Sequence, residues 1–218
     1  MDTFDILRQH LDSAFDTAAG AYAASSATAA TAATPCTEFT VAQLRAHLLG
    51  VGLRIAALGR GEPALSVPNT VEAADGDYQN AFAAARASAR ESWSALEATT
   101  GMVAPWRELS AADAAGIYAA ELIVHAWDLA TASGTTIEVN DAVIATSQEA
   151  LEREVPVEGR AELWARSRAD LPEDFPWSDP FGEVPPLSGE ISALDRLVAT
   201  SGRDPRWTAD QPSASATA

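Results

Sequence analysis

Apolar residues recur at the spacing of an α-helix in four long stretches of the chain. These stretches cover residues 3–24, 41–58, 71–98 and 111–132. In the second, Leu44, Leu48, Val51 and Ile55 lie three or four positions apart, which places them on one face of a helix. Such a face needs an apolar partner, so the pattern predicts four long helices packed against one another.

Residues that favour helix ends support two of these boundaries. Thr40 can cap the amino terminus of the second helix, and Gly59 and Gly61 follow its last turn. Ser110, with Asp113 three residues later, resembles a capping box at the start of the fourth helix. These signals come from side-chain chemistry, so they are independent of the apolar pattern.

The rest of the chain predicts shorter helices and Pro-rich loops. A fifth helix capped by Asn140 or Asp141 should reach Arg153, and shorter helices are expected near residues 160–168 and 192–201. No stretch alternates apolar and polar residues for long, so no sheet is expected. The predicted fold class is therefore all-α: a four-helix bundle with additional short C-terminal helices and loops.

The same pattern divides the chain into three parts. Residues 1–155 should form the bundle and hold any metal, residues 156–207 a helical and loop extension packed on it, and residues 208–218 a disordered tail. We expect the extension to depend on the bundle for its core.

Composition narrows the class of protein. Of 218 residues, 47% are hydrophobic and 21% charged, which is typical of a globular chain. The 31 acidic residues against 14 basic ones give a net charge of −17, which disfavours nucleic acid and anionic membrane surfaces as partners. All basic residues are Arg, a bias typical of a GC-rich genome. A single cysteine, Cys36, excludes an internal disulfide.

The start of the chain predicts a cytoplasmic location. Its first ten residues mix acidic and apolar side chains and lack the basic and apolar regions of a signal peptide. The run from Ala19 to Ala33 contains Ala, Ser and Thr but no Leu, Ile or Phe, so it is too weakly apolar to span a membrane.

Candidate chemistry concentrates on the fourth predicted helix. Glu121 and His125 are four residues apart, so their side chains share one face, and Asp128 continues that face. On the second helix, His47 lies beside the apolar stripe and is the natural third ligand for a metal. Three protein ligands with a fourth position open to water or substrate are typical of catalytic zinc. The alternative is that these histidines are hydrogen-bonded core residues and Glu121 and His125 a simple side-chain pair.

Several segments together resemble a known family. They are Thr34-Pro35-Cys36, then Val41 to Leu48 with His47, then Glu121-x-x-x-His125-Ala-Trp-Asp-Leu-Ala, and the ending Asp195-Arg-Leu with Gly202-Arg-Asp-Pro205. This set resembles the metal-binding DinB-like bundles, in particular the group related to mycothiol-dependent maleylpyruvate isomerases. The His-x-Trp-Asp-Leu-Ala segment is its most specific part.

The resemblance implies a metal site and a thiol chemistry. Matched residue by residue, it makes His47, Glu121 and His125 the ligands of a divalent metal, usually zinc, with nickel as the alternative. The open position would take water or the thiolate of a low-molecular-weight thiol such as mycothiol, giving transferase or isomerase chemistry. Isomerases of that kind carry a further C-terminal domain with strands, whereas residues 135–218 here predict helices and loops.

Other residues near these positions have weaker assignments. Asp128 can hydrogen-bond a ligand, act as a base or join two helices. Arg54 can meet an anionic substrate, although an ion pair is the favoured role, and Tyr118 can line the same cavity. Trp127 is expected to pack or to form a pocket wall. Cys36 is expected to be a small buried residue at a helix entry, and the alternative is a position near the metal.

Two function hypotheses follow. The first is a metal-dependent enzyme, or enzyme-like protein, acting on a small molecule with a thiol. The second is a non-catalytic metal-binding bundle with a structural, binding or stress-related role. An enzyme requires an accessible pocket beside the metal, whereas a structural site has a closed set of ligands. A homodimer fits either hypothesis.

Overall fold

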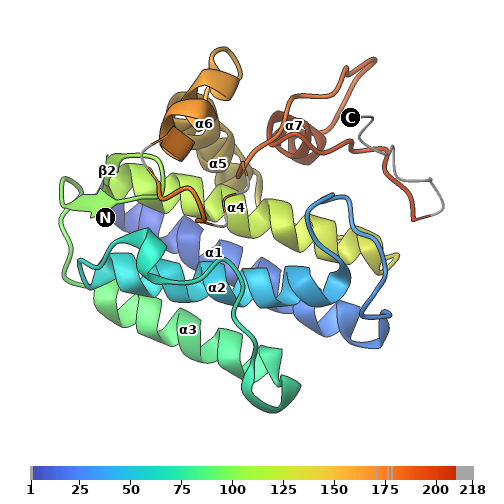
Figure 1. The fold of residues 1–218 in the computed structure, drawn as a ribbon, viewed down its shortest axis with the longest axis horizontal. Coiled ribbons are helices and arrows are strands. Elements are labelled where there is room, and N and C mark those ends of the chain that lie inside the picture. Colours follow the sequence, from blue (N-terminus) through green and yellow to red (C-terminus); the bar gives the residue numbers. More distant parts are fainter. Residues whose placement is uncertain (1, 170, 176, 178, 210–218) are drawn as a thin grey trace.

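The computed structural model describes residues 2–169, 171–175, 177 and 179–209. Helices make up 59% of the chain, so the predicted all-α class is confirmed. The four longest helices are α1 (Thr3–Ala24), α2 (Val41–Gly59), α3 (Tyr78–Trp93) and α4 (Ala111–Ala132). Their long axes run roughly alongside one another, with the C-terminal helices on the side of α4 away from α3 (Figure 1).

Apolar faces and helix caps determine these four helices. The predicted stripe on α2, Leu44 to Ile55, is fully buried, and the interior face of α4 is almost wholly apolar. Thr40 accepts a hydrogen bond from the backbone of Gln43 and so caps α2, while Ser110 caps α4 in the same way through Asp113. Contacts join α1 to α3 and α4, and α2 to α3 and α4.

The interface between α2 and α3 requires a glycine. A Cβ atom on Gly59 would lie 2.5 Å from the Trp93 ring and 2.8 Å from the Cβ atom of Ser92. Trp93 also donates its indole N–H to the Ile55 carbonyl oxygen at 2.7 Å. The close approach therefore joins the end of α2 to the end of α3.

The third helix is shorter than residues 71–98, so that prediction is wrong at both ends. Asp75 adopts φ 55°, a left-handed conformation that an α-helix cannot contain. Asp77 then accepts a hydrogen bond from the Asn80 backbone and starts α3 at Tyr78. The helix ends at Trp93, with Ser94 as its C-cap. The apolar periodicity continues past both ends, but the backbone does not follow it.

The prediction of no sheet is also wrong. Strands β1 (Gly101–Val103) and β2 (Glu108–Ser110) form an antiparallel hairpin directly before α4. Only Met102 and Leu109 point into the core, where they face each other across the pair. Three-residue strands carry too little alternation to be recognised from sequence. Figure 1 shows β2 beside the start of α4.

The C-terminal part contains α5 (Asp141–Glu154), α6 (Arg160–Ala169) and α7 (Ala193–Thr200). All three occur close to their predicted positions, with Asn140 and Ser192 as the N-caps of α5 and α7. No strand occurs among the described residues after 134. The division at residue 155 stays a prediction, and residues 210–218 of the predicted disordered tail lie outside the described residues.

Arg160 holds this C-terminal part together. It is buried and donates hydrogen bonds of 2.7–2.8 Å to the carbonyl oxygens of Gly182, Thr200 and Val155. Next to it, Gly202 has φ +93° and packs so tightly on Gly182 that a Cβ atom would meet its backbone at 2.6 Å. These contacts fix the loop after α6 against the turn that follows α7.

Helix α2 is long and apolar enough to cross a membrane, and it is the one such helix in the described part of the chain. However, 78% of its apolar window is buried inside the protein. Its hydropathy therefore reflects its place in the core.

An ion pair between α1 and α3 should make stability depend on pH. Arg86 donates two hydrogen bonds of 2.8 Å to Asp12 and lowers the pKa of its carboxyl below the usual value. Since the folded pKa is the lower one, the stabilisation is present above pH ~4 and is lost as the pH falls through the folded value. We expect Asp12→Asn to lose about 1 kcal/mol at pH 7, and less below pH 4, in urea unfolding.

The matched control for this experiment is Glu149→Gln, which neutralises an exposed carboxylate without an ion pair among the described residues. It should leave the free energy of unfolding within about 0.5 kcal/mol of wild type. A loss in Asp12→Asn that stays constant down to pH 3 would show that the ion pair is not its cause.

Candidate metal centre

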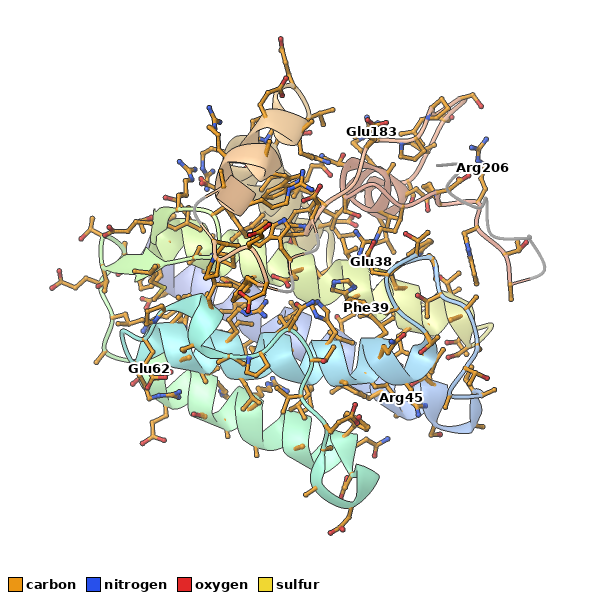
Figure 2. The ribbon with its side chains drawn as sticks, viewed as in Figure 1. Glu38, Phe39, Arg45, Glu62, Glu183 and Arg206 are labelled. Atoms are coloured by element: carbon orange, nitrogen blue, oxygen red, sulfur yellow. The ribbon has the colours of Figure 1, made fainter. Side chains whose placement is uncertain are left out.

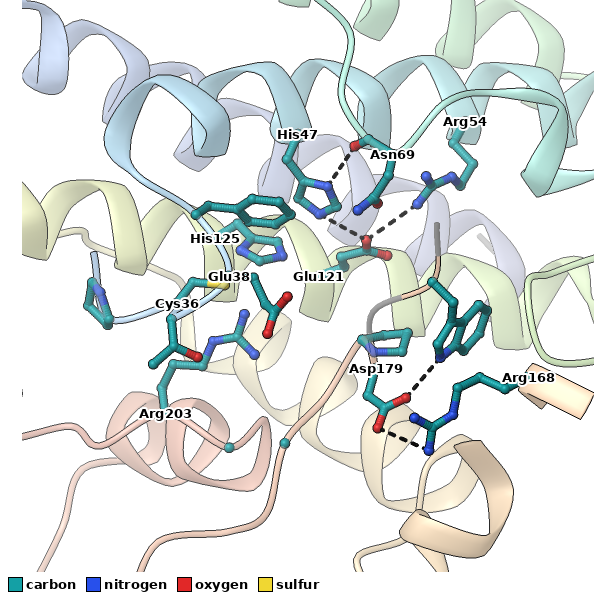
Figure 3. A pocket seen from close by; sticks show the side chains of 17 residues that line it. Cys36, Glu38, His47, Arg54, Asn69, Glu121, His125, Arg168, Asp179 and Arg203 are labelled. Atoms are coloured by element: carbon teal, nitrogen blue, oxygen red, sulfur yellow. Dashed lines mark hydrogen bonds and ion pairs between the residues drawn. The ribbon is translucent and has the colours of Figure 1, made fainter. Parts of the chain in front are cut away.

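Three potential ligands from two helices meet in the protein interior. His47 comes from α2, and Glu121 and His125 come from successive turns of α4. One ligand atom of each lies within 4.8 Å of the others, and the His47 Nε2 atom is 3.7 Å from the Glu121 carboxylate. Figure 3 shows the Glu121 carboxylate directed between His47 and Arg54. The structure therefore brings together the three residues that the sequence proposes as ligands.

The orientation of His47 is fixed by the backbone of Asn69. Its Nδ1 atom lies 2.8 Å from the Asn69 carbonyl oxygen, which can only accept, so Nδ1 carries the proton and Nε2 keeps a free lone pair. Gly50 allows this contact, because a Cβ atom there would lie 3.0 Å from the same carbonyl oxygen. Phe39 stacks on the imidazole with a 4.7 Å centroid distance. Figure 2 shows Phe39 where its loop passes over α4.

Asp128 fixes His125 in the same way. The Nδ1 atom of His125 lies 2.9 Å from Oδ2 of Asp128, which leaves Nε2 of His125 for another partner. Asp128 is fully buried, and Arg203 compensates its charge with Nε 3.4 Å from the same oxygen. Metal-binding histidines almost always have such an acceptor on the second nitrogen. Three roles were considered for Asp128, and the structure shows it as a hydrogen-bond partner of the proposed ligand His125 on the same helix, α4.

The electrostatics of the site favour a neutral imidazole at His47. Burial, together with the neighbouring His125 and Arg54, lowers the pKa of His47 well below its usual value. Neutral imidazole is the form that binds a metal. The short distance between His47 and Glu121 is therefore not an ion pair of two charged groups. Glu121 instead has a cationic neighbour in Arg54, whose Nη1 atom is 3.8 Å away.

A cavity of about 440 Å³ opens beside the three residues. Its walls come from the loop before α2, from α2, from α4 and from the C-terminal part. The lining residues are Pro35, Cys36, Thr37, Glu38, Phe39, His47, Arg54, Asn69, Glu121, His125, Arg168, Trp177, Asp179, Pro180, Gly182, Gly202 and Arg203. All three proposed ligands thus have access to a space large enough for a small molecule.

The predicted substrate residues have different positions. Arg54 lines the cavity and is buried, with 6% of its surface exposed. Tyr118 is fully buried in the core, where its hydroxyl has no partner among the described residues and burial raises its pKa. Trp127 is also buried, and neither aromatic residue belongs to the cavity lining. Only Arg54 of the three can meet a molecule in this cavity.

Two further residues line the cavity close to the proposed ligands. Cys36 is buried as predicted, and it also lies in the alternative position near the proposed metal site, where it forms a second cluster with His125 and Asp128. Burial raises the pKa of its thiol to about 11, and Asp128 is already paired with Arg203. Cys36, His125 and Asp128 are therefore a weaker candidate for metal binding than His47, Glu121 and His125. Arg203 belongs to the segment Gly202-Arg-Asp-Pro205, which contributes to the family resemblance. It lies 75 residues from Asp128 in the chain, so the sequence does not predict their contact.

One comparison with known proteins found a match. A family model described as the mycothiol maleylpyruvate isomerase N-terminal domain matches residues 11–130, more than half of the chain. The matched region includes His47, Glu121 and His125 and ends before α5. No curated protein and no solved structure matches the chain.

Proposed function

Because the chain belongs to the family of the mycothiol maleylpyruvate isomerase N-terminal domain, we propose that it is a DinB-like four-helix bundle with a divalent metal at His47, Glu121 and His125. Its reaction is a thiol-dependent transfer or isomerisation of a small molecule, with mycothiol or a similar thiol as cosubstrate. Zinc is the proposed metal and nickel the alternative. The cavity beside all three ligand residues is the observation that supports an enzyme over a structural site.

The donor set fits such an ion. Two histidines present Nε2 with Nδ1 already occupied, and Glu121 adds a carboxylate within 4.8 Å of both. A bound zinc ion supplies Lewis-acid stabilisation of a thiolate or hydroxide at neutral pH. Hydrolysis with activated water is the variant of this proposal that uses no thiol.

The chain's own residues orient and shield the reactants. Asn69 and Asp128 hold the two imidazole rings, and Phe39 covers the face of His47. The cavity extends from these rings to Glu38, Arg168 and Asp179 (Figure 3). The charged side chains of these three residues can form hydrogen bonds with a polar thiol. The protein is proposed to act on small molecules in the cytoplasm, as a monomer or a homodimer, without nucleic acid or membrane partners.

Metal content tests the proposed ligands. Plasma mass spectrometry of untagged protein loaded with zinc should find about one ion per chain in wild type and well below one in His47→Ala and Glu121→Ala. His10→Ala is the matched control, since His10 bonds to Thr146 on α5, away from the site. It should retain the metal. Wild-type protein that remains empty with both zinc and nickel would contradict the metal proposal.

Thiol binding tests the reaction class. Cobalt-substituted protein should develop a thiolate-to-cobalt charge-transfer band when mycothiol is added, and no band with its S-methyl derivative. The Cys36→Ser variant removes the one thiol of the chain, so a band in that variant must come from the added thiol. A loaded site without such a band would favour water activation or the non-catalytic alternative.

A further inference from the structure

One carboxylate oxygen of Glu121 faces two different groups. Its Oε1 atom lies 3.7 Å from Nε2 of His47 and 3.8 Å from Nη1 of Arg54 (Figure 3). Nε2 of His47 carries a lone pair, because the proton of that ring is on Nδ1 and is donated to the Asn69 carbonyl oxygen. The positive charge that the structure places beside Glu121 is therefore that of Arg54.

Arg54 and Glu121 form a buried ion pair. Their side chains are only 7% and 11% exposed, and the buried Nε atom of Arg54 has no hydrogen-bond partner among the described residues. At 3.8 Å, Nη1 attracts the carboxylate but is too far away to donate a hydrogen bond to Oε1. This contact compensates the charge of Glu121 and leaves Oε1 able to bind a cation.

The buried charges around the proposed ligands are balanced without a metal. Glu121 and Asp128 are buried carboxylates. Nη1 of Arg54 lies 3.8 Å from the first carboxylate, and Nε of Arg203 lies 3.4 Å from the second. A divalent ion adds two positive charges to this neutral set, and an ion bound to Oε1 shares that oxygen with Arg54. The two cations then repel each other in a medium that screens them poorly.

We propose that Arg54 is a positioning residue whose charge takes the place of the metal at Glu121. It compensates the carboxylate and holds it beside His47 in the metal-free protein. It also lowers the affinity of the site for a divalent ion, because the ion and the guanidinium compete for the same oxygen. This inference rests on the proposed function and adds to it a control of metal occupancy.

A zinc competition titration with a chromogenic chelator tests this role. Arg54→Met keeps an apolar side chain but removes the charge, so it should bind zinc about tenfold more tightly than wild type, or tighter still. Arg54→Lys keeps the charge and should stay closer to wild type than to Arg54→Met. A purely structural role would instead weaken zinc binding in Arg54→Met. Equal or weaker binding in a folded Arg54→Met protein overturns the inference.

Arg60→Met is the matched control for the change in net charge. Arg60 follows the last turn of the same helix, is exposed and pairs with Glu62. Its replacement should leave zinc affinity unchanged. A gain equal to that of Arg54→Met would show that the total charge of the chain is the cause, and would also overturn the inference.

A double-mutant cycle on metal-free protein tests the same pair without zinc. Arg54→Met should lower the urea midpoint of wild type and lower it much less in the Glu121→Gln background, where no charge remains to be compensated. A variant that folds only in that background supports the same coupling, and circular dichroism reports folding. Additive effects overturn the inference. If wild type takes up no zinc, the metal proposal fails, and this cycle alone decides whether Arg54 compensates Glu121.

Discussion

Replacing Asp128 with alanine is expected to destabilise the protein by about 3–5 kcal/mol and to weaken zinc binding about 10- to 100-fold. The stability loss arises because Arg203 would remain buried without its carboxylate, which lies 3.4 Å away in the folded protein. The loss of affinity arises because the His125 ring would no longer have the acceptor that fixes its Nδ1 proton. Chemical unfolding of metal-free protein and a zinc competition titration measure the two effects separately.

Asp128→Asn is the matched variant, since its amide oxygen can still accept a hydrogen bond from His125 but carries no charge for Arg203. It should retain most of the zinc affinity and lose much of the stability. Equal zinc affinity in Asp128→Ala and wild type would contradict the role of Asp128 in orienting His125.

Replacing Arg160 with alanine should release the C-terminal wall of the cavity. Three carbonyl oxygens, of Val155, Gly182 and Thr200, would lose their donor together. Each buried acceptor left without a partner costs about 1–3 kcal/mol, so we expect a total loss of about 3–5 kcal/mol, since water can reach some of them. Amide hydrogen exchange should rise in residues 179–209 and stay near wild type in α1 to α4.

Arg166→Ala is the control, because Arg166 is on the same helix but exposed. It should change the free energy of unfolding by less than about 0.5 kcal/mol. If Arg160→Ala accelerates exchange throughout all helices equally, residues 156–207 do not form a separate extension, and the predicted division at residue 155 fails.

The sequence predicts the site better than it predicts its surroundings. His47, Glu121 and His125 could be identified because helical spacing places them beside apolar stripes and the family resemblance selects the same three residues. Helix α4 begins directly after Ser110, as the capping signal predicts. Local chemistry and helical geometry suffice for these features.

Features that depend on tertiary contacts were missed. The late start of the third helix depends on Asp75 and Asp77, whose backbone conformations override a favourable apolar pattern. The pairing of Arg203 with Asp128 joins residues 75 positions apart, and no periodicity encodes it. Tyr118 and Trp127 share a helix with Glu121, yet they face the core and not the cavity. The sequence missed this because spacing alone does not fix the rotation of the helix about its axis closely enough.

The origin of the cavity walls has an evolutionary consequence. The proposed metal ligands lie within the family region, residues 11–130, whereas Arg168, Asp179 and Arg203 come from the segment after it. Mutations in that later segment are therefore expected to change which molecules the cavity accepts and to leave the proposed metal ligands unaltered. Paralogues that diverge mainly after residue 130 would thus be expected to share a reaction type and differ in the molecules they accept.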